Sequence, residues 1–179
     1  MNNKGSTMVL LVIVIALVIV LGVSVLNIAV KQYAINKFNI DSKQAFYISE
    51  TGLNEAYVKS CVLIDESINK ALQLTDDYFS INSFNEEAEN IFITNYKINI
   101  RTNIQNRIEI EANPSVQVWN DSLVFIDNIL RLILKSSYYH NDIEKVTGVE
   151  LIISVPDFRE VSEGVYDVRD YIRFKNWNS

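Results

Sequence analysis

The sequence MVLLVIVIALVIVLGVSVLNIAV occupies residues Met8 to Val30, and Ser24 and Asn27 are its only polar side chains. No charged residue lies between Lys4 and Lys31. As an α-helix, 23 residues are about 35 Å long, which is enough to cross a hydrocarbon core of about 30 Å. A secretory signal peptide has a shorter apolar stretch, of about 7 to 15 residues, before its cleavage site. We therefore expect a membrane-spanning helix that stays attached to the rest of the chain.

The charges that flank this apolar run bear on its orientation. Residues 31–43 carry three Lys and one Asp, against Lys4 and the terminal amine before the run. Because cytoplasmic flanks carry an excess of Lys and Arg, this count slightly favours a C-terminal part inside the cell. The leader, residues 1–5, is very short and ends in glycine directly before the apolar run. We give the leader more weight and expect residues 31–179 outside the cell.

The composition restricts what the rest of the chain does. With 179 residues, the chain has room for one modest domain besides the apolar run. Its 16 Lys and Arg against 22 Asp and Glu give a net charge of −6. We therefore expect no nucleic-acid partner, since a phosphate backbone requires clustered positive charge. Cys61 is the only cysteine and has no partner in the chain for a disulfide.

The apolar run is expected to continue as a helix into the exported part. The segments 23–51 and 53–113 contain neither Gly nor Pro. Apolar and small residues recur there at steps of three, four and seven, which is typical of one helix face. We predict one helix from about Thr7 to near Ala71, with residues 6–30 in the membrane and 31–74 outside. The residues expected to pack this helix on a sheet are Ala45, Ile48, Gly52, Leu53 and Ala56. For Gly52, close packing and a hinge both remain open.

Residues 75–179 are expected to form a globular β-sheet domain. After an acidic loop at about residues 76–90, apolar residues alternate with polar ones, which is typical of strands. The sequence predicts an α+β fold in which the long helix packs on an antiparallel sheet of four to six strands. The expected strands are a hairpin of Ile91–Ile100 with Arg107–Glu111, a second hairpin of Ile129–Tyr139 with Val146–Val155 turning at His140–Asp142, and a last strand at Tyr171–Trp177.

No set of residues indicates an enzyme or a cofactor. His140 lies in a predicted turn and Cys61 on a predicted helix without a nearby base. The five glycines are scattered, so no phosphate-binding loop is present. The acidic residues of the 76–90 segment lack the spacing of a calcium loop, and we expect them to be solvated. Most aromatic residues of the C-terminal part are expected in the core, although an adhesive patch is the alternative; they are Trp119, Tyr138, Tyr139, Tyr166, Tyr171, Phe174 and Trp177.

Three features of the first 60 residues resemble type IV pilins and pseudopilins, and in particular minor pilins with a PilX-like N-terminal region. A short charged leader with Lys4 ends in Gly5 directly before the apolar helix. The helix runs out of the membrane without interruption. The stretch QAFYISETGLNEA, residues 44–56, is similar to the Ala-aromatic and Glu-Thr-Gly-Leu-Asn pattern of that group.

The resemblance implies a route from the membrane to a filament. A prepilin peptidase would cleave between Gly5 and Ser6, and the new amino terminus on Ser6 would be methylated. The chain would then be a single-pass membrane protein before assembly and part of an extracellular pilus afterwards. Its expected partners are membrane lipid, the peptidase and other pilin subunits, which it would contact through the N-terminal helix.

The chain departs from the family pattern at the fifth mature position. Counting from Ser6, this position is Leu10, where most pilins carry Glu, and no carboxylate lies between Gly5 and Lys31. A subunit without that carboxylate cannot neutralise a neighbour's terminal amine. We therefore expect a structural minor subunit of a type IV pilus that sits at the tip and initiates assembly. The alternatives are a pseudopilin of a type II secretion or DNA-uptake system and an anchored binding domain that never polymerises.

Overall fold

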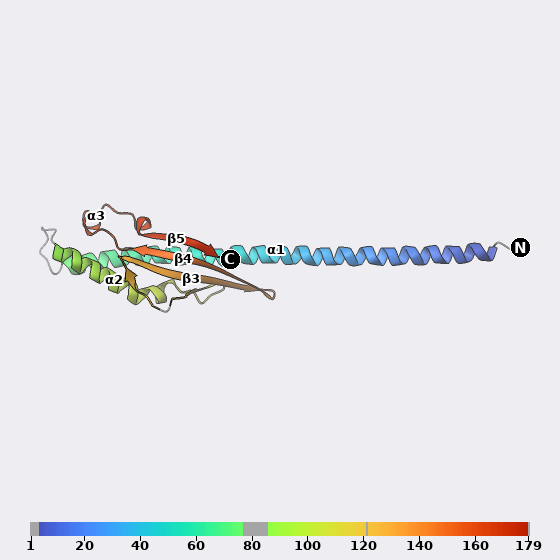
Figure 1. Ribbon diagram of the computed structural model, residues 1–179, viewed down its shortest axis with the longest axis horizontal. Helices are drawn as coiled ribbons and strands as arrows, with labels where there is room; N and C mark the ends of the chain where they lie inside the picture. Colours follow the sequence, from blue (N-terminus) through green and yellow to red (C-terminus); the bar gives the residue numbers. More distant parts are fainter. Residues whose placement is uncertain (1–3, 77–85, 121, 179) are drawn as a thin grey trace. The chain divides into compact units, whose positions relative to one another are not determined.

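The computed structural model describes residues 4–76, 86–120 and 122–178. It is an α+β fold in which a long N-terminal helix, α1 (Lys4–Asp76), packs on a C-terminal antiparallel sheet (Figure 1). The predicted fold class is therefore confirmed. The helix ends at Asp76, somewhat later than the expected end near Ala71. Two compact units share this helix, Met1–Lys43 and Gln44–Ser179.

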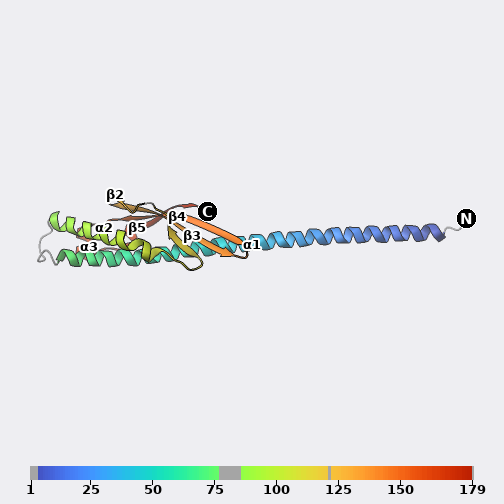
Figure 2. The same cartoon turned by 90° about the horizontal axis from the view of Figure 1, so that it is seen from below.

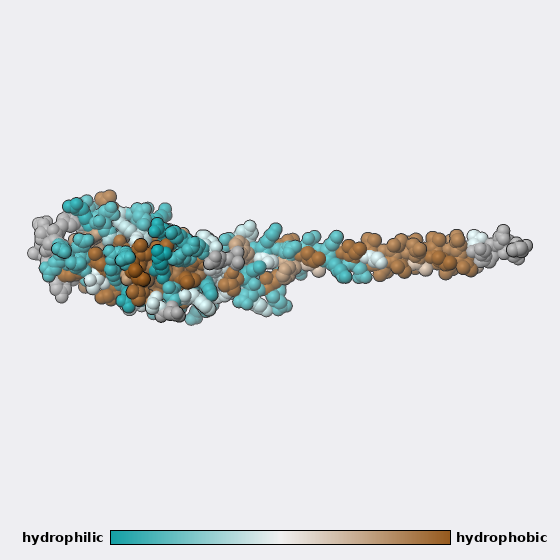
Figure 3. Space-filling model, in the orientation of Figure 1, coloured by the Kyte–Doolittle hydropathy of each residue, from teal (hydrophilic) through white to brown (hydrophobic). Residues whose placement is uncertain are grey.

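The first unit is the N-terminal part of α1, and its surface is apolar from Met8 to Val30. The large apolar side chains from Met8 to Val30 are 51 to 72% exposed (Figure 3). The helix is long and apolar enough there to cross a membrane, and none of that stretch is buried within the chain. Ser24 donates to the Val20 carbonyl oxygen at 2.8 Å, so its hydroxyl is satisfied inside the helix. This unit therefore has the length and composition of a membrane span without an intramolecular packing partner.

The second unit is built on two helices, the C-terminal part of α1 and α2 (Glu86–Ile108). On α1 the fully buried side chains recur at steps of three and four, as in Leu53, Ala56, Ser60 and Ile64. On α2 they are spaced by four residues throughout and comprise Ala88, Phe92, Tyr96, Ile100, Ile104 and Ile108. Both stripes face one core, which the sheet closes.

The first predicted hairpin is wrong, because its segments form α2 and not two strands. Ile91–Ile100 and most of 107–111 lie within or next to that helix, and only Ile110 makes an isolated bridge, to Val116. A stripe spaced by four residues places its members at even intervals, so it imitates the alternation of a strand. The exposed Ile98 lies between the buried Tyr96 and Ile100, so apolar residues occupy every second position there, as in a strand. The expected acidic loop falls largely on residues 77–85, which lie outside the described residues.

The sheet is antiparallel and its spatial order is β1-β3-β4-β5, with β2 also pairing with β3. The strands are β1 (Ser115–Val118), β2 (Phe125–Ile126), β3 (Ile129–His140), β4 (Ile143–Ser154) and β5 (Ile172–Asn178). The second predicted hairpin is confirmed as β3 and β4. Its turn residues Asn141 and Asp142 have φ values of 48° and 64°, which Asn and Asp tolerate better than most residues. The predicted last strand is confirmed as β5.

One face of the sheet covers the helices, as Figure 2 shows for α1 and α2. Leu130, Leu132 and Leu134 of β3 are fully buried, and the alternate side chains point to the opposite face. Between β4 and β5, the chain forms a short helix, α3 (Phe158–Ser162), and a 3-10 helix, η1 (Val168–Tyr171). β1 and β2 were not predicted, because both are short and lie near the cis-Pro114 turn and the Asp127-Asn128 turn.

Candidate functional site

The expected cleavage site lies at the start of α1. The helix begins at Lys4, so the backbone of Gly5 and Ser6 belongs to its first turn and does not precede it. Residues 1–3 of the expected leader lie outside the described residues. Leu10, at the fifth position after Gly5, is 65% exposed, as its apolar neighbours are. From Met8 to Val30, the first unit thus offers an apolar surface on all sides of the helix.

The stretch of residues 44–56 lies where α1 meets the sheet. Ala45 is 2% exposed, and Leu53 and Ala56 are fully buried. Ile48 is half-buried at the margin of this contact. The small side chains leave room for the strands to approach the helix backbone closely.

Gly52 marks a close approach between α1 and the sheet. A Cβ atom at this position would lie 2.6 Å from the Ser136 Oγ atom of β3, and 3.2 Å from the Pro114 Cγ and Val116 Cγ2 atoms. Only glycine therefore fits here without displacing neighbours. This observation favours close packing over a hinge as the role of Gly52.

Ser49 adds a polar contact that was not predicted from the sequence. Its Oγ atom lies 2.5 Å from the Thr147 Oγ1 atom of β4, and it donates to the Phe46 carbonyl oxygen at 2.8 Å. The Thr147 hydroxyl is therefore the donor between the two side chains. Both are buried, so the bond is shielded from water. The helical spacing of Ala45, Ser49, Gly52 and Ala56 could have placed Ser49 on the packed face, but it could not have identified Thr147 as the partner.

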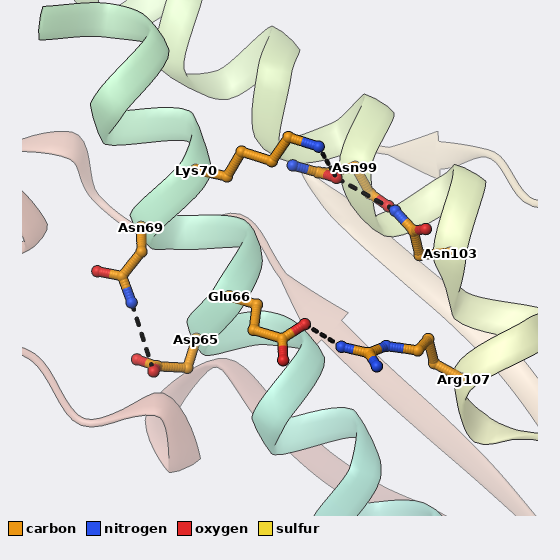
Figure 4. A network of polar contacts seen from close by, with 7 residues as sticks. All are labelled: Asp65, Glu66, Asn69, Lys70, Asn99, Asn103 and Arg107. Carbon is orange, nitrogen blue, oxygen red and sulfur yellow. Dashed lines mark hydrogen bonds and ion pairs between the residues drawn. The ribbon is translucent and has the colours of Figure 1, made fainter.

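A polar seam joins α1 to α2 (Figure 4). Arg107 forms an ion pair with Glu66, and Lys70 Nζ donates to Asn99 Oδ1 at 3.4 Å. Asn103 Nδ2 donates to the Asn99 carbonyl oxygen at 2.8 Å. The ion pair is exposed, so it contributes at most about 1 kcal/mol, and the seam mainly fixes how α2 lies along α1. Sequence reasoning missed the seam because it assigned residues 91–111 to strands.

The aromatic residues divide between the core and the surface. Tyr171 is buried, and Phe174 packs on Tyr57 of α1 with ring centroids 5.2 Å apart. Burial raises the pKa of the Tyr171 phenol to about 12, and its hydrogen bond to the Glu160 carboxylate adds to the shift. Trp119 and Tyr139 are both 58% exposed. Trp177 is also on the surface, so the core expectation fails for these three.

The other residues considered for chemistry stay apart. His140 is exposed at the end of β3 and stacks on Tyr138, with ring centroids 6.2 Å apart. Cys61 is a free thiol on α1. Burial raises the pKa of this thiol, which makes it a weaker nucleophile at neutral pH. Within the described residues, no group of three or more His, Cys, Asp or Glu side chains is placed to hold a metal ion.

Comparisons with known proteins leave these residues to be interpreted on their own. No family model matches the chain. No curated protein and no solved structure matches it either. The interpretation of the chain therefore depends on α1, on its contact with the sheet, and on the pilin resemblance of the first 60 residues.

Proposed function

We propose that the chain is a structural minor subunit of a type IV pilus, placed at the tip of the filament. One observation carries the proposal: a single helix, α1, is wholly exposed and apolar from Met8 to Val30, yet is packed on a sheet from Ala45 onward. The first part suits lipid before assembly and neighbouring helices afterwards. The second part holds the domain that such a helix would present on a filament.

The exchange of lipid for protein around the apolar part of α1 has a low free-energy cost. The backbone hydrogen bonds of a helix are satisfied internally, so the helix tolerates either environment. Lipid tails and apolar side chains are about equally apolar, so the transfer has little hydrophobic cost. Gly22 has no neighbouring atom within 4 Å of an added Cβ, which leaves its face open for a neighbouring helix.

The tip position follows from Leu10. The subunit below a tip subunit needs a carboxylate to meet the amine above it, whereas the tip subunit has no amine above it to meet. An unpaired carboxylate inside the apolar core would be costly, so leucine suits the tip. A pseudopilin of a type II secretion or DNA-uptake system would use the same helix, and an anchored binding domain would use it only as a membrane span.

The first experiment tests processing. The chain is coexpressed with a prepilin peptidase and the intact mass is measured. We expect the loss of residues 1–5 from the wild type and no loss from Gly5→Leu, because a bulky side chain blocks close approach of the backbone to the protease. Asn2→Ala is the matched control and should be processed like the wild type. A wild-type mass that still includes residues 1–5 would contradict the proposal.

The second experiment tests assembly and position. Filaments are sheared from cells, and an epitope at the C-terminus is detected by immunogold labelling. We expect label in the sheared fraction at one end of each filament, and fewer filaments when the chain is deleted. Label along the shaft would contradict the tip position alone. Absence from sheared filaments, with the chain retained in the membrane, would support the anchored-domain alternative.

A further inference from the structure

The face of the sheet that points away from the helices carries a groove and a group of cations. This outer face is formed by alternate residues of four strands and by the segment after β1. Its described side chains include Trp119, Arg131, Ile133, Lys135, Val146, Glu150, Arg173, Lys175 and Asn176. Figure 3 shows hydrophilic and hydrophobic side chains side by side over the sheet domain. Neither α1 nor α2 covers this face.

A shallow groove of about 480 Å³ lies on the outer face. Gly148 of β4 pairs with Lys135 of β3 and lies in the groove lining, where the absence of a side chain contributes to the hollow. Arg131 Nη1 lies 3.0 Å from Glu150 Oε1, and Asn176 Nδ2 donates to Glu150 Oε2 at 2.7 Å. Glu150 is the only carboxylate among the described residues of the lining, and both of its oxygens are therefore engaged.

Three cations of the outer face have no carboxylate partner among the described residues. Lys135, Arg173 and Lys175 form no ion pair with any residue that the structure describes. The second unit as a whole is acidic, with 12 Lys and Arg against 21 Asp and Glu, a net charge of −9. Uncompensated positive charge is thus gathered on one face of an acidic domain. Such a face suits an anionic ligand.

Trp119 adds an aromatic surface beside these cations. Its backbone N–H donates to the Ile133 carbonyl oxygen at 2.8 Å, which fixes it to the edge of β3. Lys135 Nζ lies 3.3 Å from the centroid of its ring, and the side chain is still 58% exposed. Asn120 holds the same edge, because it accepts from the Ile133 N–H at 2.7 Å and donates to the Arg131 carbonyl oxygen at 3.0 Å. The indole is therefore held in place and available to a ligand.

We propose that this groove, together with Trp119 and Lys175 beside its lining residues Lys135 and Glu150, binds an anionic polysaccharide. The apolar face of a sugar ring would pack on Trp119, and the acidic groups along the polymer would pair with Lys135 and Lys175. Sugar hydroxyls suit the polar lining of Asn176 and Glu150. Single-stranded nucleic acid is also a polyanion, so competition by an oligonucleotide separates it from an acidic polysaccharide. The proposal relies on the proposed function only in placing the sheet domain outside the cell.

The test uses the full chain in non-ionic detergent with fluorescein-labelled polygalacturonate oligomers as the probe. We expect saturable binding by fluorescence anisotropy that weakens as salt is raised to about 0.15 M, because the contacts are exposed. Neutral dextran, a poly-glutamate peptide and single-stranded oligo-dT serve as competitors and should compete poorly. In a Trp177→Phe background, the remaining Trp emission reports on Trp119 and should change on binding.

Variants locate the site. The double variant K135Q/K175Q should bind at least about tenfold more weakly, and Trp119→Ala at least about fivefold, in proportion to the contacts each removes. Lys175→Gln alone, at an exposed position of β5, gives a smaller loss and guards against misfolding of the double variant. Arg101→Gln removes an exposed cation on α2 and should stay within about twofold of the wild type.

Several results would overturn the proposal. They are no saturable binding, equal binding of dextran, stronger binding of poly-glutamate or oligo-dT, and unchanged affinity of K135Q/K175Q. The binding experiment needs neither cleavage nor filaments. Its failure therefore leaves the pilus proposal intact, and failure of the filament experiments leaves the groove result intact.

Discussion

Gly52 of α1 and Ser136 of β3 are packed so closely that a methyl group on Gly52 would lie 2.6 Å from the Ser136 Oγ atom. The hydroxyl of Ser136 is buried and has no hydrogen-bond partner among the described residues. An unpaired buried hydroxyl is itself unfavourable. The helix and the strand thus meet at a contact whose benefit is close packing and not a hydrogen bond.

Gly52→Ala is expected to destabilise the domain by about 1 to 2 kcal/mol, even though alanine gains about 1 kcal/mol in helix propensity, because overpacking costs more than this gain. Denaturant unfolding of the full chain in detergent, followed by circular dichroism, measures the change. Ser136→Ala should be neutral or stabilising and should restore part of the stability in the double variant. A Gly52→Ala variant as stable as the wild type would show that the contact between Gly52 and Ser136 can accommodate a methyl group.

Thr147→Val is expected to lower the free energy of unfolding by about 1 kcal/mol, because it removes the hydrogen bond to Ser49 while keeping the side-chain shape. Ser49 would still donate to the Phe46 carbonyl oxygen, so no second group is left unpaired. Thr51→Val is the matched control at an exposed position of α1 and should change stability by less than about 0.5 kcal/mol. Equal effects of the two substitutions would argue against a stabilising Ser49–Thr147 bond.

Phe92→Ala should cost about 3 to 5 kcal/mol, because it empties a fully buried site on α2. Ile98→Ala should cost less than about 0.5 kcal/mol, since Ile98 is 56% exposed. In a strand the two residues would share a face, so both substitutions would be costly. Comparing the two unfolding curves therefore separates the helix from the hairpin that sequence alternation suggested.

Alkaline pH should destabilise the domain through Tyr171. Its folded-state pKa of about 12 exceeds the unfolded value of about 10, so the folded state holds its proton longer as the pH rises. Stability is fully present below pH 10 and falls between pH 10 and about 12. Melting temperatures across this range measure the effect. Tyr171→Phe should lower stability at neutral pH by about 1 kcal/mol, through the lost bond to Glu160, and should show a shallower alkaline decline.

The sequence predicted correctly those parts of the fold whose apolar pattern fits either a helix or a strand, but not both. The apolar run fixed the start of α1, and the Asn141-Asp142 turn between two alternating segments fixed the β3–β4 hairpin. The region of α2 failed because Tyr96, Ile98 and Ile100 alternate although only two of them are buried. The missing Gly and Pro between Leu53 and Asn113 were the better guide to a helix there.

Within the candidate site, the sequence pointed only to residues whose small size is unusual at their position. Gly52 stood out as a glycine inside a helix, but the sequence left close packing and a hinge both open, and the atoms around Gly52 favour packing. The Ser49–Thr147 bond joins residues 98 positions apart, so no local pattern reports it. The groove of the outer face depends on which strands are neighbours, and β1 was not predicted. Charge counting alone also hid its cations, because an acidic total conceals a local basic patch.

The four-residue spacing on α2 has a geometric consequence. Each step of four residues advances the stripe by about 40° around the axis, because an α-helix has about 3.6 residues per turn. From Ala88 to Ile108 the stripe therefore spirals by about 200°, so the two ends of α2 bury nearly opposite sides. Phe92 accordingly meets Phe158 of α3, whereas Tyr96 already reaches Phe125 of β2. One inserted residue in the middle would rotate one end by about 100° relative to the other, which would turn the buried side chains of that end out of the core.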